Sequence, residues 1–263
     1  METRPPELNA ELASKLQHAL TAGQDALFQI ILDPEQYIVA AALKNPALTE
    51  DHLLALLKRR DLKNEIPERI FQRHKKSLSH RLLLALVKNS ATSDVIFRTL
   101  VPQLHLFELV DLCFLPGATP DRKFIAERNI LQRLPTTPLG NKITLARRAP
   151  SAIVAELLKE GNSTLTEACL GSPRLKEAAI YQLLNSSRAS ADIISMIARH
   201  NRWQNRPNLR LAILRNSRTP AVWFTLWLPK LSLPLLKQLT SGQRLNPKQK
   251  LLVANELKRR GGR

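Results

Sequence analysis

Arginine is the residue type that most readily offers chemistry in this sequence, and it is concentrated between positions 199 and 218. Its planar guanidinium group makes paired hydrogen bonds to phosphate, and a nearby aromatic side chain can stack on an unpaired base. Lysines and arginines close to the C-terminus extend the same chemistry. We therefore predict a nucleic-acid-binding site formed by Arg199, Arg202, Trp203, Arg206, Arg210, Arg215, Arg218, Lys248, Lys250, Arg259 and Arg260.

The charge of the chain is unevenly distributed. The 263 residues carry 40 Lys and Arg against 22 Asp and Glu, a net charge of +18. Residues 193–263 contain 15 bases and one acid, a net +14, whereas residues 1–192 contain 25 bases and 21 acids, a net +4. Such asymmetry indicates a polyanion partner, which would be DNA or RNA, an acidic protein face or an anionic membrane surface. The alternative is a solvated surface without a ligand.

Two other groups of residues are open to more than one interpretation. A second basic segment contains Arg69, Arg73, His74, Lys75, Lys76, His80 and Arg81. It is either a further ridge of the same site or a helix end whose cations complement the helix dipole. Trp223 and Trp227 lie four residues apart in an apolar helical segment, and for them core packing is favoured over base stacking.

The sequence provides little that indicates catalysis. It contains no GxSxG, Walker loop, HExxH or Cys/His metal spacing, and its six histidines are dispersed. Cys113 and Cys169 lie in apolar helical patterns, which predicts reduced core thiols rather than a disulfide. We therefore predict no catalytic residue, no metal ligand and no cofactor, and a binding protein is favoured over an enzyme.

The elements that would carry these side chains appear twice in the chain. Residues 81–123 and 208–250 align without a gap at a shift of 127, with 15 identities in 43 positions. Each copy has an apolar helical run that ends at Asn-Ser, a Thr that would cap the next helix, and prolines at equivalent positions. Residues 41–57 and 185–197 repeat part of this pattern. The recurring unit is helix, Asn turn, cap and helix.

Composition predicts an all-α fold. Hydrophobic residues make up 44% and aromatic residues 5% of the chain. The apolar residues are mostly Leu and Ala, which favour helices, and no run alternates strictly as a half-buried strand would. No segment approaches the length of about 20 apolar residues that spans a bilayer, and the start has no signal-peptide pattern. We expect a cytoplasmic protein without a transmembrane segment.

Helix pairs that repeat at about 40–47 residues, with Asn or Pro in the turn, resemble HEAT-like and armadillo-like repeats, including their variant leucine-rich-repeat type. The resemblance implies a right-handed α-solenoid of HEAT-like helix-hairpin repeats that forms one domain over residues 1–263. Within it, residues 135–143 are a candidate minor boundary and residues 193–263 form the basic C-terminal third. Proteins of this kind are chiefly binding surfaces and scaffolds.

Three functions remain open at this point. The first is a non-enzymatic helical-repeat protein whose basic surface binds nucleic acid or another polyanion. The second is a scaffold or adaptor that binds an acidic protein partner. The third is a repair enzyme similar to the HEAT-like alkylpurine DNA glycosylases, although no motif here matches the catalytic aspartate of that group. The last function would require a buried carboxylate beside a basic, aromatic-lined concavity.

Overall fold

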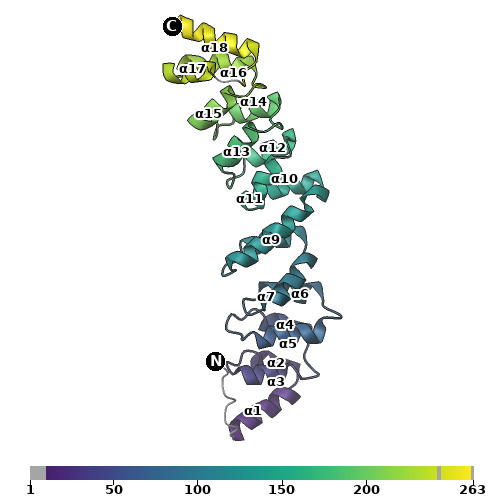
Figure 1. The fold of residues 1–263 in the computed structure, drawn as a ribbon. Helices are drawn as coiled ribbons and strands as arrows, with labels where there is room; N and C mark the ends of the chain where they lie inside the picture. Colours follow the sequence, from purple (N-terminus) through teal and green to yellow (C-terminus); the bar gives the residue numbers. More distant parts are fainter. Residues whose placement is uncertain (1–9, 242–243, 262–263) are drawn as a thin grey trace. The chain divides into compact units, whose positions relative to one another are not determined.

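The computed structural model describes residues 10–241 and 244–261, and within these residues every regular element is a helix. The predicted all-α class is therefore confirmed (Figure 1). Most of the helices are seven to ten residues long and each buries a narrow apolar stripe. In the helix at Ala191–Arg199, for example, Ile193, Ile194, Ile197 and Ala198 are buried. This spacing of i, i+1, i+4 and i+5 places the apolar side chains on one face.

The chain divides into two units between Asn129 and Ile130. Unit 1 contains α1 to α8 and most of α9. Its elements are α1 Ala10–Thr21, α2 Gln24–Ile30, α3 Gln36–Ala42, α4 Glu50–Leu56, α5 Glu65–His74, α6 His80–Lys88, α7 Asp94–Leu100, the 3₁₀ turn η1 Val101–Gln103, α8 Leu106–Cys113 and α9 Pro120–Arg133. Helices pack on the next but one, since α1 contacts α3, α3 contacts α5, α2 contacts α4, and α4 contacts α6.

Unit 2 continues the same arrangement. Its elements are η2 Leu134–Thr136, α10 Leu139–Arg148, α11 Ser151–Leu158, α12 Ser163–Leu170, α13 Glu177–Leu184, α14 Ala191–Arg199, α15 Pro207–Leu214, α16 Ala221–Trp227, η3 Leu228–Lys230, α17 Leu233–Thr240 and α18 Pro247–Arg259. Here α10, α12 and α14 pack in succession, as do α11, α13 and α15 (Figure 1). The proline-rich stretch at 135–143 forms η2 and the start of α10.

Asparagines at the ends of helices join neighbouring hairpins. The side-chain amide of Asn89 donates to the carbonyl oxygens of Leu57 at 2.8 Å and Arg59 at 2.9 Å. Its Oδ1 accepts the backbone N–H of Ala91 at 2.8 Å. Asn45 makes the same pattern of three bonds one hairpin earlier. The last carbonyls of a helix have no partner within it, so these amides satisfy groups that burial would otherwise leave unpaired.

Thr92 and Thr219, the threonines that the two copies place before a helix, do not act as caps. Thr92 Oγ1 donates to the carbonyl oxygen of Leu86 at 2.6 Å, and Thr219 Oγ1 donates to that of Ile213 at 2.5 Å. Both hydroxyl groups therefore bind back to the preceding helix and do not cap the following one. The sequence pattern located the turn correctly but assigned the hydroxyl to the wrong helix, because Thr can satisfy either end.

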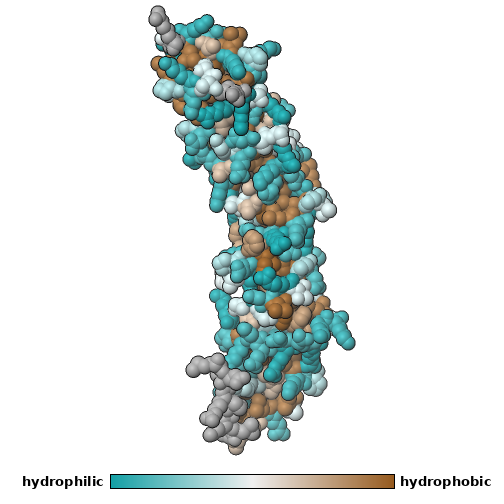
Figure 2. Space-filling model, in the orientation of Figure 1, coloured by the Kyte–Doolittle hydropathy of each residue, from teal (hydrophilic) through white to brown (hydrophobic). Residues whose placement is uncertain are grey.

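The tryptophans of α16 lie on its buried apolar face. Trp223 and Trp227 are 9% and 7% exposed, with ring centroids 5.1 Å apart, so the expectation of core packing is confirmed. Cys113 and Cys169 are free and buried, as predicted. No helix within the described ranges is both long and apolar enough to cross a membrane. Figure 2 shows hydrophilic residues over much of the visible face, with apolar residues between them.

Candidate nucleic-acid interface

The positive charge belongs almost entirely to unit 2. Residues 130–263 contain 23 Lys and Arg against 6 Asp and Glu, a net charge of +17. Residues 1–129 contain 17 bases and 16 acids, a net charge of +1. The two figures add up to the net +18 of the chain. An electrostatic attraction for a polyanion must therefore come mainly from unit 2.

Several of the predicted arginines stabilise the fold through backbone carbonyls. Arg202 Nη1 donates to the carbonyl oxygen of Ser172 at 2.6 Å, and its Nη2 donates to that of Leu175 at 3.2 Å. Arg260 donates in the same way to the carbonyl oxygens of Leu231 and Leu228, at 2.6 and 2.8 Å. Cations near helix C-termini are stabilising, and the guanidinium fork suits two neighbouring carbonyls. These two side chains are therefore partly committed to joining hairpins.

Trp203 lies in the core and not on the surface. It is 3% exposed, and its Nε1 donates to the carbonyl oxygen of Leu170 at 3.0 Å. The guanidinium group of Arg202 lies 4.4 Å from its ring centroid. Burial leaves no ring face for an unpaired base, so we assign Trp203 to packing. Trp203 lies among arginines in the sequence because one turn carries both the buried Trp203 ring and the Arg202 guanidinium group that binds the carbonyls.

The other predicted residues are spread over several elements. Arg206 lies 3.9 Å from Glu177, and Arg210 donates to Asn205 Oδ1 at 2.8 Å. Arg259 pairs with Glu256 at 2.8 Å, and its hydrogen bond lowers the pKa of Glu256 to about 2. Three predicted residues are exposed and form no ion pair in the described part of the chain, namely Arg199, Lys248 and Lys250.

Two of the predicted residues, Arg215 and Arg218, do line a common groove. Two adjoining hollows of 350 and 640 Å³ lie at the C-terminal ends of α13, α15 and α17, and both are lined by Asn185, Ala212, Arg215 and Arg244. Arg218 lines the smaller hollow and Tyr181 the larger one. None of the lining residues is acidic. We call this surface the arginine groove.

The contacts within the arginine groove leave its cations available. Arg244 Nη1 donates to Asn185 Oδ1 at 3.3 Å, a neutral partner. The side chain of Arg215 has no hydrogen bond or ion pair to any described residue. Arg218 donates to the carbonyl oxygen of Ser187, which uses one part of its guanidinium group. Tyr181 is 44% exposed beside them. Sequence reasoning missed Arg244 and Tyr181, since each stands apart from the arginine run.

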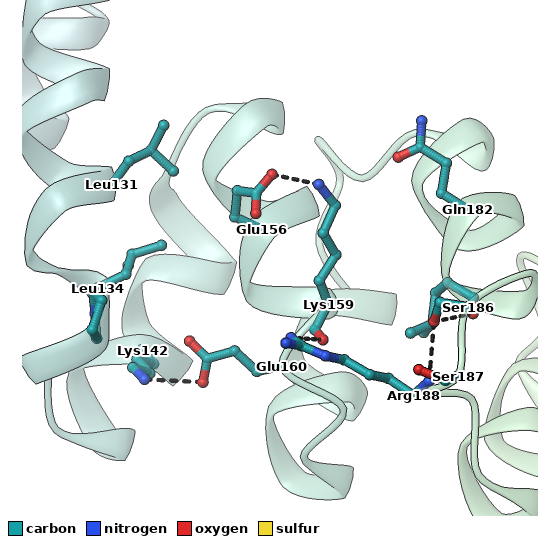
Figure 3. Close-up of a pocket in the computed structure, with 12 residues that line it drawn as sticks. Leu131, Leu134, Lys142, Glu156, Lys159, Glu160, Gln182, Ser186, Ser187 and Arg188 are labelled. Carbon is teal, nitrogen blue, oxygen red and sulfur yellow. Dashed lines mark hydrogen bonds and ion pairs between the residues drawn. The ribbon is translucent and has the colours of Figure 1, made fainter.

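A neighbouring hollow of 840 Å³ differs in its electrostatics (Figure 3). Lys142 pairs with Glu160 at 2.9 Å, and Lys159 pairs with Glu156 at 2.5 Å. Arg188 donates to the carbonyl oxygen of Lys159 at 2.7 Å. Because each lysine here is paired with a carboxylate, this hollow attracts an anion much less strongly than the arginine groove does.

One group of side chains in unit 1 has the composition of a metal site. His80 on α6 meets His105 and Glu108 at the start of α8, with one ligand atom of each within 4.8 Å of the others. His80 Nε2 lies 2.8 Å from a carboxylate oxygen of Glu108. The sequence predicts no metal ligand, because the 17 residues between α6 and α8 hide this proximity. A Zn²⁺ ion would accept such a His/His/Glu set.

The cysteines offer no nucleophile. Burial raises the pKa of both Cys113 and Cys169 to about 12. A thiol with such a pKa is almost wholly protonated near neutral pH, and the thiolate is the reactive form.

No family model matches this chain, and no curated protein or solved structure is significantly similar to it.

Proposed function

We propose that unit 2 binds single-stranded nucleic acid in the arginine groove. The observation that carries this proposal is that Arg215, Arg218 and Arg244 line one groove without any acidic neighbour in its lining. Guanidinium groups recognise phosphate oxygens through two parallel N–H bonds, and three of them would follow a flexible backbone. The net charge of +17 on unit 2 would add a longer-range attraction.

A single strand suits this groove better than a duplex does. Tyr181 presents an exposed ring at the edge of the larger hollow. Base-aromatic stacking contributes about 1–3 kcal/mol per base, but it requires a base that is not already paired and stacked in a helix. The amide of Asn185 and the hydroxyl group of Ser217 would add hydrogen bonds to sugars or base edges. Sequence preference is expected to be weak.

The helix dipoles oppose an anion at this place. Their partial negative charge can be compared with the positive charge of the arginines. The groove lies at helix C-termini, where each helix contributes about half a negative charge. Part of this is already offset, because the amide of Asn216 donates to the carbonyl oxygen of Leu184 at 2.6 Å. Three full positive charges exceed what remains, so the groove stays attractive to phosphate.

We also propose that each unit is a stretch of right-handed α-solenoid with HEAT-like helix-hairpin repeats. Contacts between alternate helices and the recurring Asn and Arg bonds to carbonyls one hairpin earlier support this interpretation. Stacked repeats of this kind bury a continuous core and repeat their surface features along the chain. Small-angle X-ray scattering of the full chain would test it, because a solenoid should have a larger radius of gyration than a globular protein of equal length.

The glycosylase alternative has no support in the structure. It would need a buried carboxylate, and no Asp or Glu is buried among the residues that the structure describes. The adaptor alternative does have an observation in its favour, which is a groove in unit 1 that is considered in the next subsection.

A binding titration over a range of KCl concentrations tests the proposal. Fluorescein-labelled 20-nucleotide DNA and RNA single strands and the matching duplex would be compared by anisotropy. Single strands should bind more tightly than the duplex near physiological salt. In the variant Arg215→Ser/Arg244→Ser, the affinity should fall at least tenfold. The slope of log K against log salt should become about 1.4 units shallower, because two phosphate contacts are lost.

Two control variants remove the same charge elsewhere in unit 2. Arg147→Ser/Lys230→Ser removes exposed cations that do not line the groove, and Arg199→Ser/Lys250→Ser removes two residues of the set predicted from sequence. Both should weaken binding by less than threefold, and circular dichroism should confirm that all variants are folded. Absence of binding by the unaltered chain, or equal losses in the groove variant and the controls, would reject the arginine groove as the site.

A further inference from the structure

A second groove, in unit 1, occupies the equivalent place in the first sequence copy. It has a volume of 770 Å³ and lies at the C-terminal ends of α4, α6 and α8. Its lining positions Leu54, Lys58, Ala85, Lys88 and Gly117 correspond, at the shift of 127, to Tyr181, Asn185, Ala212, Arg215 and Arg244 of the arginine groove. The same backbone feature is thus built twice with different side chains. We call the copy in unit 1 the leucine groove.

The floor of the leucine groove is apolar. Leu54, Leu84 and Leu115 line it and are each partly exposed, and Pro116 stands exposed at its edge. In the arginine groove, Tyr181 takes the place of Leu54, and Arg244 takes the place of Gly117. A sugar-phosphate backbone gains little from contact with leucine side chains. A ligand with apolar side chains of its own would gain about 25 cal/mol for each Å² of apolar surface that it removes from water.

The rim of the leucine groove is cationic. Lys58, Arg60 and Lys88 line it and are exposed, and their side chains have no hydrogen bond or ion pair to any residue that the structure describes. Its one acidic lining residue, Asp51, already pairs with Arg81 at 3.1 Å. Unit 1 as a whole has a net charge of only +1, so this local excess is not a general property of the unit.

We propose that the leucine groove binds an acidic amphipathic helix of a partner protein. Leucine-type side chains on one face of such a helix, spaced at i, i+3, i+4 and i+7, would cover the apolar floor. Carboxylates on its flanks would meet Lys58, Arg60 and Lys88. The occupant is a different protein and not a second copy of this chain, because a net charge of +18 on each copy opposes self-association.

The probe that tests this inference is an 18-residue peptide with Leu at helical i, i+3, i+4 and i+7 spacing and Glu at most other positions. Calorimetric titration into the full chain should give a dissociation constant in the micromolar range. A peptide of equal charge with every Leu replaced by Ser should bind at least tenfold more weakly. Equal affinity of the two peptides would show attraction by charge alone and would overturn the proposal.

Variants of the chain locate the site. Lys58→Glu/Lys88→Glu should weaken binding of the Leu/Glu peptide at least tenfold. Lys44→Glu/Arg98→Glu changes the charge of unit 1 equally, at exposed positions that do not line the leucine groove, and should change the affinity less than twofold. Equal effects of the two pairs would overturn the proposal.

Peptide binding in the leucine groove is independent of nucleic-acid binding by unit 2, and the same variants separate the two binding activities. Arg215→Ser/Arg244→Ser should leave peptide binding unchanged, while Lys58→Glu/Lys88→Glu should leave the affinity for single-stranded DNA within threefold. If the Lys58→Glu/Lys88→Glu variant lost DNA binding and the unaltered chain did not bind the peptide, the leucine groove would be a nucleic-acid surface and the proposal of a protein partner would be wrong.

Discussion

Arg122 and Gln249 lie 127 positions apart and hold equivalent sets of three backbone carbonyls. Arg122 donates to the carbonyl oxygens of residues 89, 90 and 92, and Gln249 Nε2 donates to those of residues 216, 217 and 219. Both side chains are buried, at 7% and 2% exposure. The two copies therefore make equivalent hydrogen bonds with different residue types. A neutral amide and a guanidinium group can each do this because both supply N–H donors to the carbonyls of the turn.

This equivalence predicts how substitutions of Arg122 are ranked. Arg122→Met keeps the length of the side chain but removes all its donors, and should lower the free energy of unfolding by about 2–4 kcal/mol. Arg122→Gln should cost less than half as much, because Gln at the equivalent position makes all three bonds. Urea denaturation followed by circular dichroism measures both. Equal costs for Gln and Met would mean that packing against Phe97, not carbonyl bonding, is what Arg122 contributes.

Asn89 should be among the most sensitive positions of unit 1. Its side chain makes three hydrogen bonds to the backbone from a buried site, so Asn89→Ala leaves two carbonyls and one N–H unpaired. The expected loss is about 2–4 kcal/mol. Asn141→Ala, at an exposed site on α10, is the matched control and should shift the urea midpoint only slightly. A small effect at Asn89 would contradict the view that asparagine joins the hairpins.

The same asparagines show how far sequence reasoning reaches. Asn89 was predicted to end a helix, and α6 does end at Lys88 with Asn89 as its C-cap, because helix stopping depends on local chemistry. Its acceptor, the carbonyl of Leu57, could not be predicted, since 32 residues separate them and only the packing of hairpins brings them together. The all-α class follows from composition and periodicity, which are local properties as well.

Side-chain roles within the arginine run were not predictable for a related reason. Arg202 and Arg215 are the same residue type in the same basic stretch, yet one clamps carbonyls and the other lines a groove. The role differs because Arg202 lies in the turn that carries the buried Trp203, whereas Arg215 ends α15. Arg244 was missed because it is isolated in sequence, and it enters the groove through the connection between α17 and α18.

Trp203 should affect stability and leave binding unchanged. Trp203→Phe keeps most of the apolar volume but removes the Nε1 donor and leaves the carbonyl oxygen of Leu170 unpaired. Thermal unfolding should show a loss of about 1–3 kcal/mol. The affinity of the folded variant for single-stranded DNA should stay within twofold of the unaltered chain. A tenfold loss of affinity at unchanged stability would show that the ring contacts the ligand.

The buried thiols should resist modification. Because burial raises the pKa of Cys113 and Cys169 to about 12, the thiolate fraction at pH 8 is very small. A thiol reagent such as dithiobisnitrobenzoate should label neither residue within minutes in the native protein, and should label both in denaturing urea. The variant Ser163→Cys, at an exposed position, is the positive control for the reagent. Rapid labelling of the native chain would mean that α8 or α12 opens readily.

Glu108 should give unit 1 a pH dependence in the acid range. Partial burial acts to raise the pKa of Glu108, but the hydrogen bonds from His80 and from the backbone N–H of His105 outweigh it, so this pKa lies below the ordinary value of 4.5. A carboxyl group with a depressed folded-state pKa contributes stability that is fully present above its unfolded-state pKa. The contribution is lost as the pH falls through the folded-state pKa.

The variant Glu108→Gln isolates that contribution. At pH 7 it should be less stable than the unaltered chain by about 1 kcal/mol, because it loses the charge-assisted bond to His80 and weakens the cap of α8. As the pH falls below 4.5, the gap between the two urea midpoints should close, since Glu108 becomes neutral in both states. Glu167→Gln, at an exposed position without an ion pair in the described part of the chain, should show no such gap. A gap that persists at low pH would mean that the side chain acts through its shape and not through its charge.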